Sequence, residues 1–246
     1  MSLTQTQVLQ LNHRSVRRFL DKPLNPGQLD ELIRCGQAAA TSSFIQAYSI
    51  VRVTCPEVRS IIAKAAGGQI WIEKSAEFLV FCADLNRINR ACQNVGKGEL
   101  EGYSEHSLAA VIDVALMGQN LILAAESQGL GGVFIGGIRN QPEIVVDHLN
   151  LPRWVTPLFG MCLGWPDSDS DVKPRMPVDS ILHQDQYRAI EPERMAEYDE
   201  LMSEYYAGCG SNVKLTDWSN ATANAMQGKK REHMLDFLQA RGFFIC

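Results

Sequence analysis

Five consecutive residues near the N-terminus combine cationic and hydroxyl side chains. His13, Arg14, Ser15 and Arg17 are interrupted only by the apolar Val16. Arginine grips phosphate oxygens in a bidentate manner, and a neighbouring hydroxyl or imidazole adds further hydrogen-bond donors. The segment therefore predicts a site for a dianionic phosphate. Taken alone, however, the same pattern is more typical of a solvated basic loop.

Three further segments carry residues that suit a flat, polar ligand. They are Thr41-Ser42-Ser43, the run from Gly129 to Gly137 with its five glycines, and Lys173-Pro174-Arg175. Hydroxyl groups donate to a polar ring edge, glycine removes the Cβ between backbone and ligand, and proline stiffens a loop that bears two cations. Each segment has a structural alternative, namely a cap or turn, close packing of strand on helix, or an ordinary surface loop.

Several function classes lose support from motifs and composition. The sequence has no dinucleotide-binding G-x-G-x-x-G after a predicted strand, no P-loop, no G-x-S-x-G and no H-E-x-x-H. Its seven cysteines are scattered without a Cys-x-x-Cys pair, unlike a zinc site or a disulfide framework. A net charge of -5 opposes nonspecific nucleic-acid binding. Asn12 and His13 interrupt the N-terminal apolar run, so we expect no membrane span, no signal peptide and a cytoplasmic location.

The spacing of apolar residues predicts the elements that must position these segments. Helices are expected over 3–11, 25–40, 56–67, 107–128 and 142–149, and strands over 49–54, 77–82, 133–135 and 156–163. The strand over 77–82 is nearly all apolar and should be central in its sheet. The helix over 107–128 is apolar on nearly every side, which places it in the protein interior or in a subunit interface. Residues 85–103 have weak periodicity and indicate a surface excursion.

A helical tail follows the last predicted strand. Amphipathic helices are expected over 193–206 and 224–241, and no strand remains to pair with them. Such a tail must pack on its own domain or on a partner subunit.

The segments described so far occur together with other motifs in a fixed order. The set is His13-Arg14-Ser15-x-Arg17-x-Phe19, Thr41-Ser42-Ser43-Phe44-x-Gln46, Gly67-Gly68-Gln69, Glu77-Phe78-x-Val80-Phe81-Cys82, Gly129 to Arg139, Leu158-Phe159-Gly160-x-Cys162-Leu163-Gly164 and Lys173-Pro174-Arg175-x-Pro177. In order and spacing this set resembles the nitroreductase family, in the branch of oxygen-insensitive NADPH nitroreductases and NADPH-flavin reductases. The resemblance spans nearly the whole chain.

The resemblance implies a fold and an assembly. We expect one α+β domain over 1–246, with an antiparallel sheet flanked by helices. Residues 193–246 would form a helical C-terminal arm that wraps the partner in an intertwined homodimer. One FMN would bind noncovalently at each of two sites in the dimer interface.

The resemblance also assigns site residues. The FMN phosphate and the pyrimidine side of the ring would be held by His13, Arg14, Ser15, Arg17, Lys173 and Arg175. Gln69 would reach the ring edge, backbone contacts would come from Phe134, Ile135, Gly136 and Gly137, and the partner subunit would supply Thr41, Ser42 and Ser43. No metal and no catalytic side chain are expected, because the chemistry belongs to the flavin. Lys214 and Arg231 would bind NADPH, whereas Cys209 stands where the family pattern prefers arginine.

The implied activity is reduction of nitroaromatics, quinones or related small acceptors by NADPH, in a ping-pong, two-electron reaction on FMN. The alternative is an NADPH-FMN reductase that supplies reduced flavin to a partner oxygenase. A different class is an FMN-binding store or sensor without turnover, which Cys209 and the lack of a dedicated catalytic side chain would allow. Binding of nucleic acid or membrane through residues 229–231 is disfavoured by the acidic composition.

Overall fold

The computed structural model describes residues 2–168, 171–208, 215–228 and 230–246. The chain divides into two compact units, one formed by Met1–Ser170 with Arg231–Cys246 and the other by Asp171–Lys230. Each unit is described below by itself.

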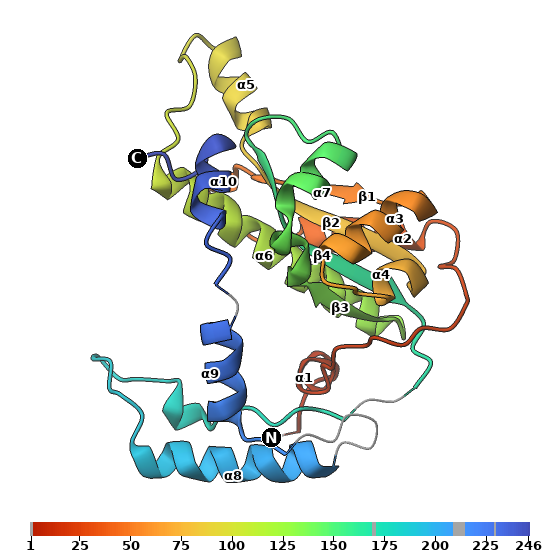
Figure 1. The fold of residues 1–246 in the computed structure, drawn as a ribbon, viewed down its shortest axis with the longest axis vertical. Helices are drawn as coiled ribbons and strands as arrows, with labels where there is room; N and C mark the ends of the chain where they lie inside the picture. The colour runs from red at the N-terminus through yellow and green to blue at the C-terminus, as the bar shows by residue number, and fades with distance from the viewer. Residues whose placement is uncertain (1, 169–170, 209–214, 229) are drawn as a thin grey trace. The chain divides into compact units, whose positions relative to one another are not determined.

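The first unit is built on a four-stranded antiparallel sheet in the order β1-β2-β4-β3 (Figure 1). Its strands are β1 (Tyr48–Arg52), β2 (Glu77–Asp84), β3 (Gly131–Ile135) and β4 (Val155–Gly164). Every residue of β2 is buried, and β2 pairs with a strand on each side. The predicted antiparallel α+β architecture and the central place of this strand are confirmed.

Helices cover both faces of the sheet in the first unit (Figure 1). They are α1 (Gln5–Leu11), α2 (Gln28–Gln37), α3 (Pro56–Ala65), α4 (Trp71–Lys74), α5 (Asn86–Asn94), α6 (Ser104–Ser127), α7 (Pro142–His148) and α10 (Met234–Ala240). Successive side chains of a strand point to opposite faces. Accordingly Phe81 of β2 joins a core with α2 and α6, whereas Phe78 joins a second core with α3, α7 and α10.

Helix α6 has one apolar face that its own unit does not cover. Met117 and Leu121 are fully buried against the sheet, but Leu108, Ile112 and Leu116 are 49%, 55% and 44% exposed. These three residues, called here the α6 stripe, recur every four positions and therefore lie on one side of the helix. By length and composition alone α6 could cross a membrane, yet half of its apolar window is buried, as in the core helix of a soluble protein.

The predicted elements differ most from the structure in three places. Helix α2 begins at Gln28 after Gly27, whose φ of 78° suits glycine, so Asn25 is not its N-cap. The excursion over 85–103 contains α5, which the weak apolar pattern did not indicate. The single helix predicted over 224–241 is wrong, because α9 (Trp218–Gly228) ends at a glycine and α10 begins only at Met234.

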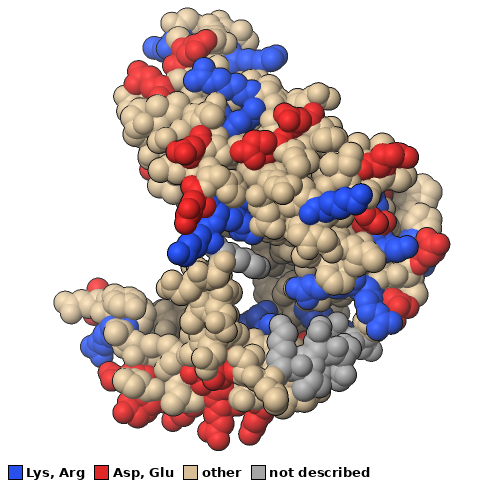
Figure 2. All heavy atoms as spheres, in the orientation of Figure 1, with Lys and Arg blue, Asp and Glu red and all other residues tan. Residues whose placement is uncertain are grey.

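The second unit contains α8 (Pro192–Gly208) and α9, with a short turn η3 (Val178–Ser180). Tyr198 of α8 is buried and meets the Trp218 ring edge-on at 5.8 Å, and Asp199 accepts a hydrogen bond from the Ser219 N–H at 2.8 Å. Acidic side chains gather along the other side of α8 (Figure 2). Helix α10, in contrast, belongs to the first unit, where Phe237 is buried.

Candidate functional site

The basic loop is fastened to the start of β3. The Val16 N–H donates to the Gly132 carbonyl at 2.9 Å, and Ser15 forms a parallel bridge with Gly132. Val16 is buried so closely against Gly131 that a Cβ added there would lie 2.5 Å from Val16 Cγ2. With Val16 turned inward, Arg17 on the other side of the chain is exposed. The loop thus holds its cations outward from a fixed backbone.

The side chain of His13 is oriented by a partner that sequence reasoning missed. His13 Nδ1–H donates to Glu126 Oε1 on α6 over 2.6 Å, and the two side chains are 24% and 12% exposed. This contact leaves the Nε2 edge of His13 for a ligand. Glu126 lies 113 positions further along the sequence, so no local pattern connects the two residues.

The end of β3 meets the loop that carries Gln69. Gly137 is the second residue of the turn η2 (Gly136–Asn140), and it touches the carbonyl of Ala66 so closely that a Cβ could not fit. Next to Ala66, Gly67 and Gly68 have φ of 85° and 77°, and this left-handed pair ends α3. Gln69 follows at once and is half-buried. The glycines therefore bring Gln69 to the same end of β3 as the backbone of Gly137.

Two apolar residues of β3 lie in different environments. Phe134 is 36% exposed and meets Phe159 edge-on, with ring centroids 5.2 Å apart. Ile135 is buried in the core. The structure therefore collects three predicted segments of the first unit along β3: the basic loop at its start, Phe134 and Ile135 within it, and the Gln69 loop at its end.

The hydroxyl segment is placed elsewhere. Ser42 and Ser43 are exposed in the turn η1 (Ser42–Phe44), and Thr41 directly precedes it. The hydrogen bonds from this segment to other elements run to Asp113 of α6, not to β3. Within one chain, the structure does not bring Thr41, Ser42 and Ser43 to the segments gathered along β3.

A buried carboxylate fixes that hydroxyl segment. Asp113 is fully buried, and its two oxygens accept the Ser42 N–H at 2.8 Å and the Ala47 N–H at 3.1 Å. Between these anchors the backbone takes a left-handed conformation at Ser43, Phe44 and Gln46. Such φ values cost on the order of 1–3 kcal/mol each and persist only where the surroundings enforce them. Asp113 was not predicted, because an acid in an apolar helix has no sequence signature for this role.

In the second unit, the Lys173-Pro174-Arg175 segment rests on α8. The Tyr198 hydroxyl donates to the Pro174 carbonyl at 3.0 Å, and Lys173 Nζ lies 5.6 Å from the centre of the Tyr206 ring. Burial raises the pKa of Tyr198, while the nearby charge of Arg175 opposes that shift. Lys173 and Arg175 are both exposed. That they join the phosphate site of the first unit stays a prediction.

Of the residues expected to bind NADPH, Lys214 lies outside the described residues, as does Cys209. Arg231 is described, and its Nε–H donates to Asn140 Oδ1 at 3.0 Å. This contact places Arg231 beside the turn that follows β3.

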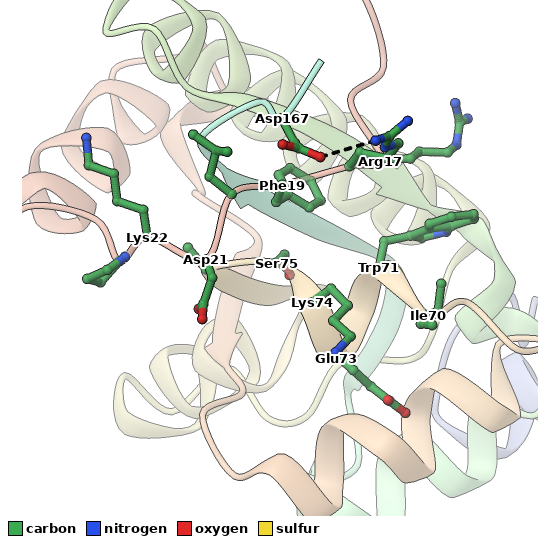
Figure 3. A pocket seen from close by; sticks show the side chains of 14 residues that line it. Arg17, Phe19, Asp21, Lys22, Ile70, Trp71, Glu73, Lys74, Ser75 and Asp167 are labelled. Atoms are coloured by element: carbon green, nitrogen blue, oxygen red, sulfur yellow. Dashed lines mark hydrogen bonds and ion pairs between the residues drawn. The ribbon is translucent and has the colours of Figure 1, made fainter. Parts of the chain in front are cut away.

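A cavity of about 660 Å³ lies beside the basic loop. Residues 17–23 line it from one side, and residues 70, 71 and 73–76 line it from the other (Figure 3). Asp167, which also lines it, pairs with Arg18 at 3.3 Å. Of the predicted cofactor residues only Arg17 lines it, so the cavity adjoins the candidate site without coinciding with it. Within the described part of the chain, no cluster of three His, Cys, Asp or Glu side chains could hold a metal ion.

Models of known families match most of the chain. The one described as "Nitroreductase family" matches residues 11–165, and "Nitroreductase family, C-terminal domain" matches residues 173–245. The chain is 41% identical over 241 residues to the oxygen-insensitive NADPH nitroreductase of Salmonella typhimurium, covering 98% of this chain and 99% of that protein. It is 43% identical over 235 residues to the NADPH-flavin oxidoreductase of Vibrio harveyi, covering 94% and 95%.

Solved structures agree with these sequence relatives. The crystal structure of nitroreductase A from Vibrio parahaemolyticus superposes with a TM-score of 0.91 at 39% identity and covers 99% of both chains. The NADPH:FMN oxidoreductase from Vibrio harveyi complexed with NAD+ gives a TM-score of 0.89 at 39% identity, covering 98% of this chain and 99% of that one. The similarity includes the predicted sheet, the central helix and the helical tail.

Proposed function

Because the chain belongs to the nitroreductase family, we propose that the segments gathered along β3 are its flavin site and that NADPH reduces the flavin there. The protein is an FMN-dependent oxidoreductase that uses NADPH, as are the relatives named NADPH-flavin oxidoreductase and FMN reductase (NADPH). The observation that carries the site assignment is the fastening of the basic loop and the Gln69 loop to opposite ends of one short strand.

The residues present fit FMN. Arg17 offers a bidentate cation for the phosphate, with Arg14 and Ser15 next to it. At the other end of β3, the missing Cβ of Gly137 lets its backbone pack directly on the Ala66 carbonyl, which holds this turn beside the half-buried Gln69. We propose that Lys173 and Arg175 complete the phosphate site. Bound FMN supplies the two-electron chemistry, and these side chains orient it and favour the negative charge that reduction adds.

A second copy of the chain is part of the proposed site. Thr41, Ser42 and Ser43 are held away from β3 by Asp113, so they do not complete the site of their own chain. The α6 stripe exposes apolar surface on the same helix that carries Asp113. We propose that two copies pack through this stripe, so that each hydroxyl segment meets the flavin of its partner. Of the predicted arm over 193–246, residues 231–246 pack in the first unit, so only residues 193–230 would reach across the dimer. We propose further that the protein is cytoplasmic and that the whole chain functions as one domain.

The proposed acceptors are nitroaromatics and quinones, and Lys214 with Arg231 would bind the extra phosphate of NADPH. Hydride donor and acceptor must both come within roughly 3–3.5 Å of the reacting ring atom, so they use one space in turn. A ping-pong pattern follows. Delivery of reduced flavin to an oxygenase remains the second candidate, supported by the name NADPH-flavin oxidoreductase of a 43% identical relative.

The decisive experiment is the absorption spectrum of the purified protein before and after anaerobic NADPH. We expect a flavin spectrum that bleaches within seconds and returns when a quinone or nitrofurazone is added. Flavin that binds but is not bleached would indicate the store or sensor instead. Protein that takes up no FMN would contradict the site altogether. Steady-state rates with free FMN and with quinone, measured side by side, separate the two candidate reductases.

A further inference from the structure

We propose that Trp71 is a positioning residue that fixes which end of the Gln69 amide faces the bound flavin. This inference rests on the proposed function and adds a residue that neither the sequence motifs nor the family comparison singled out. The observation behind it is a hydrogen bond from Trp71 Nε1–H to Gln69 Oε1 at 2.5 Å.

The chemistry of the indole sets the orientation of the amide. Nε1–H of tryptophan is a donor only, so the Gln69 atom that meets it must be the carbonyl oxygen. The NH₂ group of Gln69 then points away from Trp71. No hydrogen bond from this NH₂ group is formed to the described residues. Gln69 therefore offers a donor, not an acceptor, to a ligand at the end of β3.

The backbones of Gln69 and Trp71 are both restrained by the surrounding structure. Gly67 and Gly68 direct the chain out of α3, and the Gln69 N–H donates to the Ala63 carbonyl at 3.1 Å. On the other side, Ile72 is fully buried and anchors α4, while Trp71 itself packs against the second core. Neither backbone can turn without disturbing the core. The side chain of Gln69 is the freest part of this pair, and the indole removes much of that freedom.

The direction of the amide matters for electron transfer. The carbonyl and nitrogen atoms of the flavin pyrimidine edge gain negative charge on reduction, so a fixed N–H donor stabilises the reduced form more than the oxidised form. A Gln69 amide with its oxygen toward the ring would do the reverse. Trp71 thus raises the preference of the site for reduced FMN without contacting the reacting atoms.

The test uses holoprotein and two readouts other than turnover. The midpoint potential of bound FMN is measured by equilibration with a redox dye, and the affinity for oxidised FMN by titration of apoprotein. Trp71→Phe keeps an aromatic ring and removes the donor. Trp165→Phe is the matched control, because its Nε1–H donates at 3.1 Å to the Pro23 carbonyl, away from Gln69.

We expect Trp71→Phe to weaken the preference for reduced over oxidised FMN about tenfold, which lowers the two-electron midpoint potential by about 30 mV. Trp165→Phe should leave the potential unchanged. Gln69→Glu, whose carboxylate still accepts from Trp71 but cannot donate, should lower it further than Trp71→Phe. In a Gln69→Ala background, Trp71→Phe should have no additional effect, because the indole acts only through the amide.

A midpoint potential that Trp71→Phe does not change would overturn the inference while leaving the proposed function intact. An equal shift in the presence and absence of Gln69 would also overturn it, since the indole would then act through packing alone. Wild-type protein that binds no FMN would overturn the proposed function and this inference together.

Discussion

Replacement of Asp113 by alanine is expected to be the most damaging single change at the hydroxyl segment. It removes the acceptor of two backbone N–H groups, those of Ser42 and Ala47, from a site where the aspartate is fully buried. A hydrogen bond to a charged group contributes about 1.5–3 kcal/mol to stability. Ala47 is fully buried, so its N–H would lose the hydrogen bond to Asp113 with no water to replace it. Ser42 is exposed, so its N–H can form a hydrogen bond with water instead.

From these terms we expect Asp113→Ala to lower the free energy of unfolding by about 2–4 kcal/mol. For a unit of this size, 1 kcal/mol shifts the midpoint of thermal unfolding by roughly 2–4 °C, so the total shift is on the order of 4–16 °C. Thermal and urea unfolding measure it directly. Because the left-handed residues that follow Ser42 would be released, affinity for FMN should fall as well.

Two variants provide the comparison. Asp113→Asn keeps the shape and one acceptor oxygen and should fall between alanine and wild type. Asp167→Ala removes a carboxylate that is 40% exposed and paired with Arg18, a surface contact worth about 0–1 kcal/mol. If Asp113→Ala lowered the midpoint no more than Asp167→Ala does, the idea that a buried acid holds the segment would be refuted.

Further expectations concern the flavin site, the dinucleotide and the core. Arg17→Ala should weaken FMN binding roughly 10- to 150-fold in a fluorescence titration, the equivalent of about 1.5–3 kcal/mol; unchanged affinity would mean that the phosphate lies elsewhere. Arg231→Ala should raise KM for NADPH more than KM for NADH, and equal effects would remove Arg231 from the 2′-phosphate site. Gly137→Ala should destabilise the protein in a thermal melt, because its Cβ would collide with the Ala66 carbonyl. Burial raises the pKa of the Cys162 thiol to about 12, so iodoacetamide at pH 8.5 should alkylate the exposed Cys35 and spare Cys162, as read by mass spectrometry of the native protein.

Sequence patterns predicted best those features that depend on residues close together in the sequence. The nearly all-apolar run of β2 predicted a central strand, and for the glycines around β3 the contact of Gly137 with Ala66 bears out the alternative of tight packing of strand on helix. These features depend on periodicity and on the missing Cβ, both of which are local. The family motifs then joined the local segments into one fold.

Contacts between residues that are far apart in the sequence could not be predicted from local patterns. Glu126 orients His13 across 113 positions, and Asp113 reaches Ser42 across 71. Trp71 is only two positions from Gln69, but the hydrogen bond from its indole to the Gln69 amide depends on side-chain orientation, which has no sequence signature. The error over 224–241 had a different origin, because two short amphipathic helices in succession have nearly the same apolar pattern as one.

Helix α6 also limits how this sequence can change. Asp113 and Glu126 are thirteen positions apart on one rigid rod, which at about 1.5 Å per residue separates them by roughly 20 Å. Inserting or deleting one residue between them would rotate one carboxylate by about 100° relative to the other. The hydroxyl segment or His13 would then lose its anchor, whichever register the helix chose. A change in the length of α6 between Asp113 and Glu126 is therefore not tolerable over evolution.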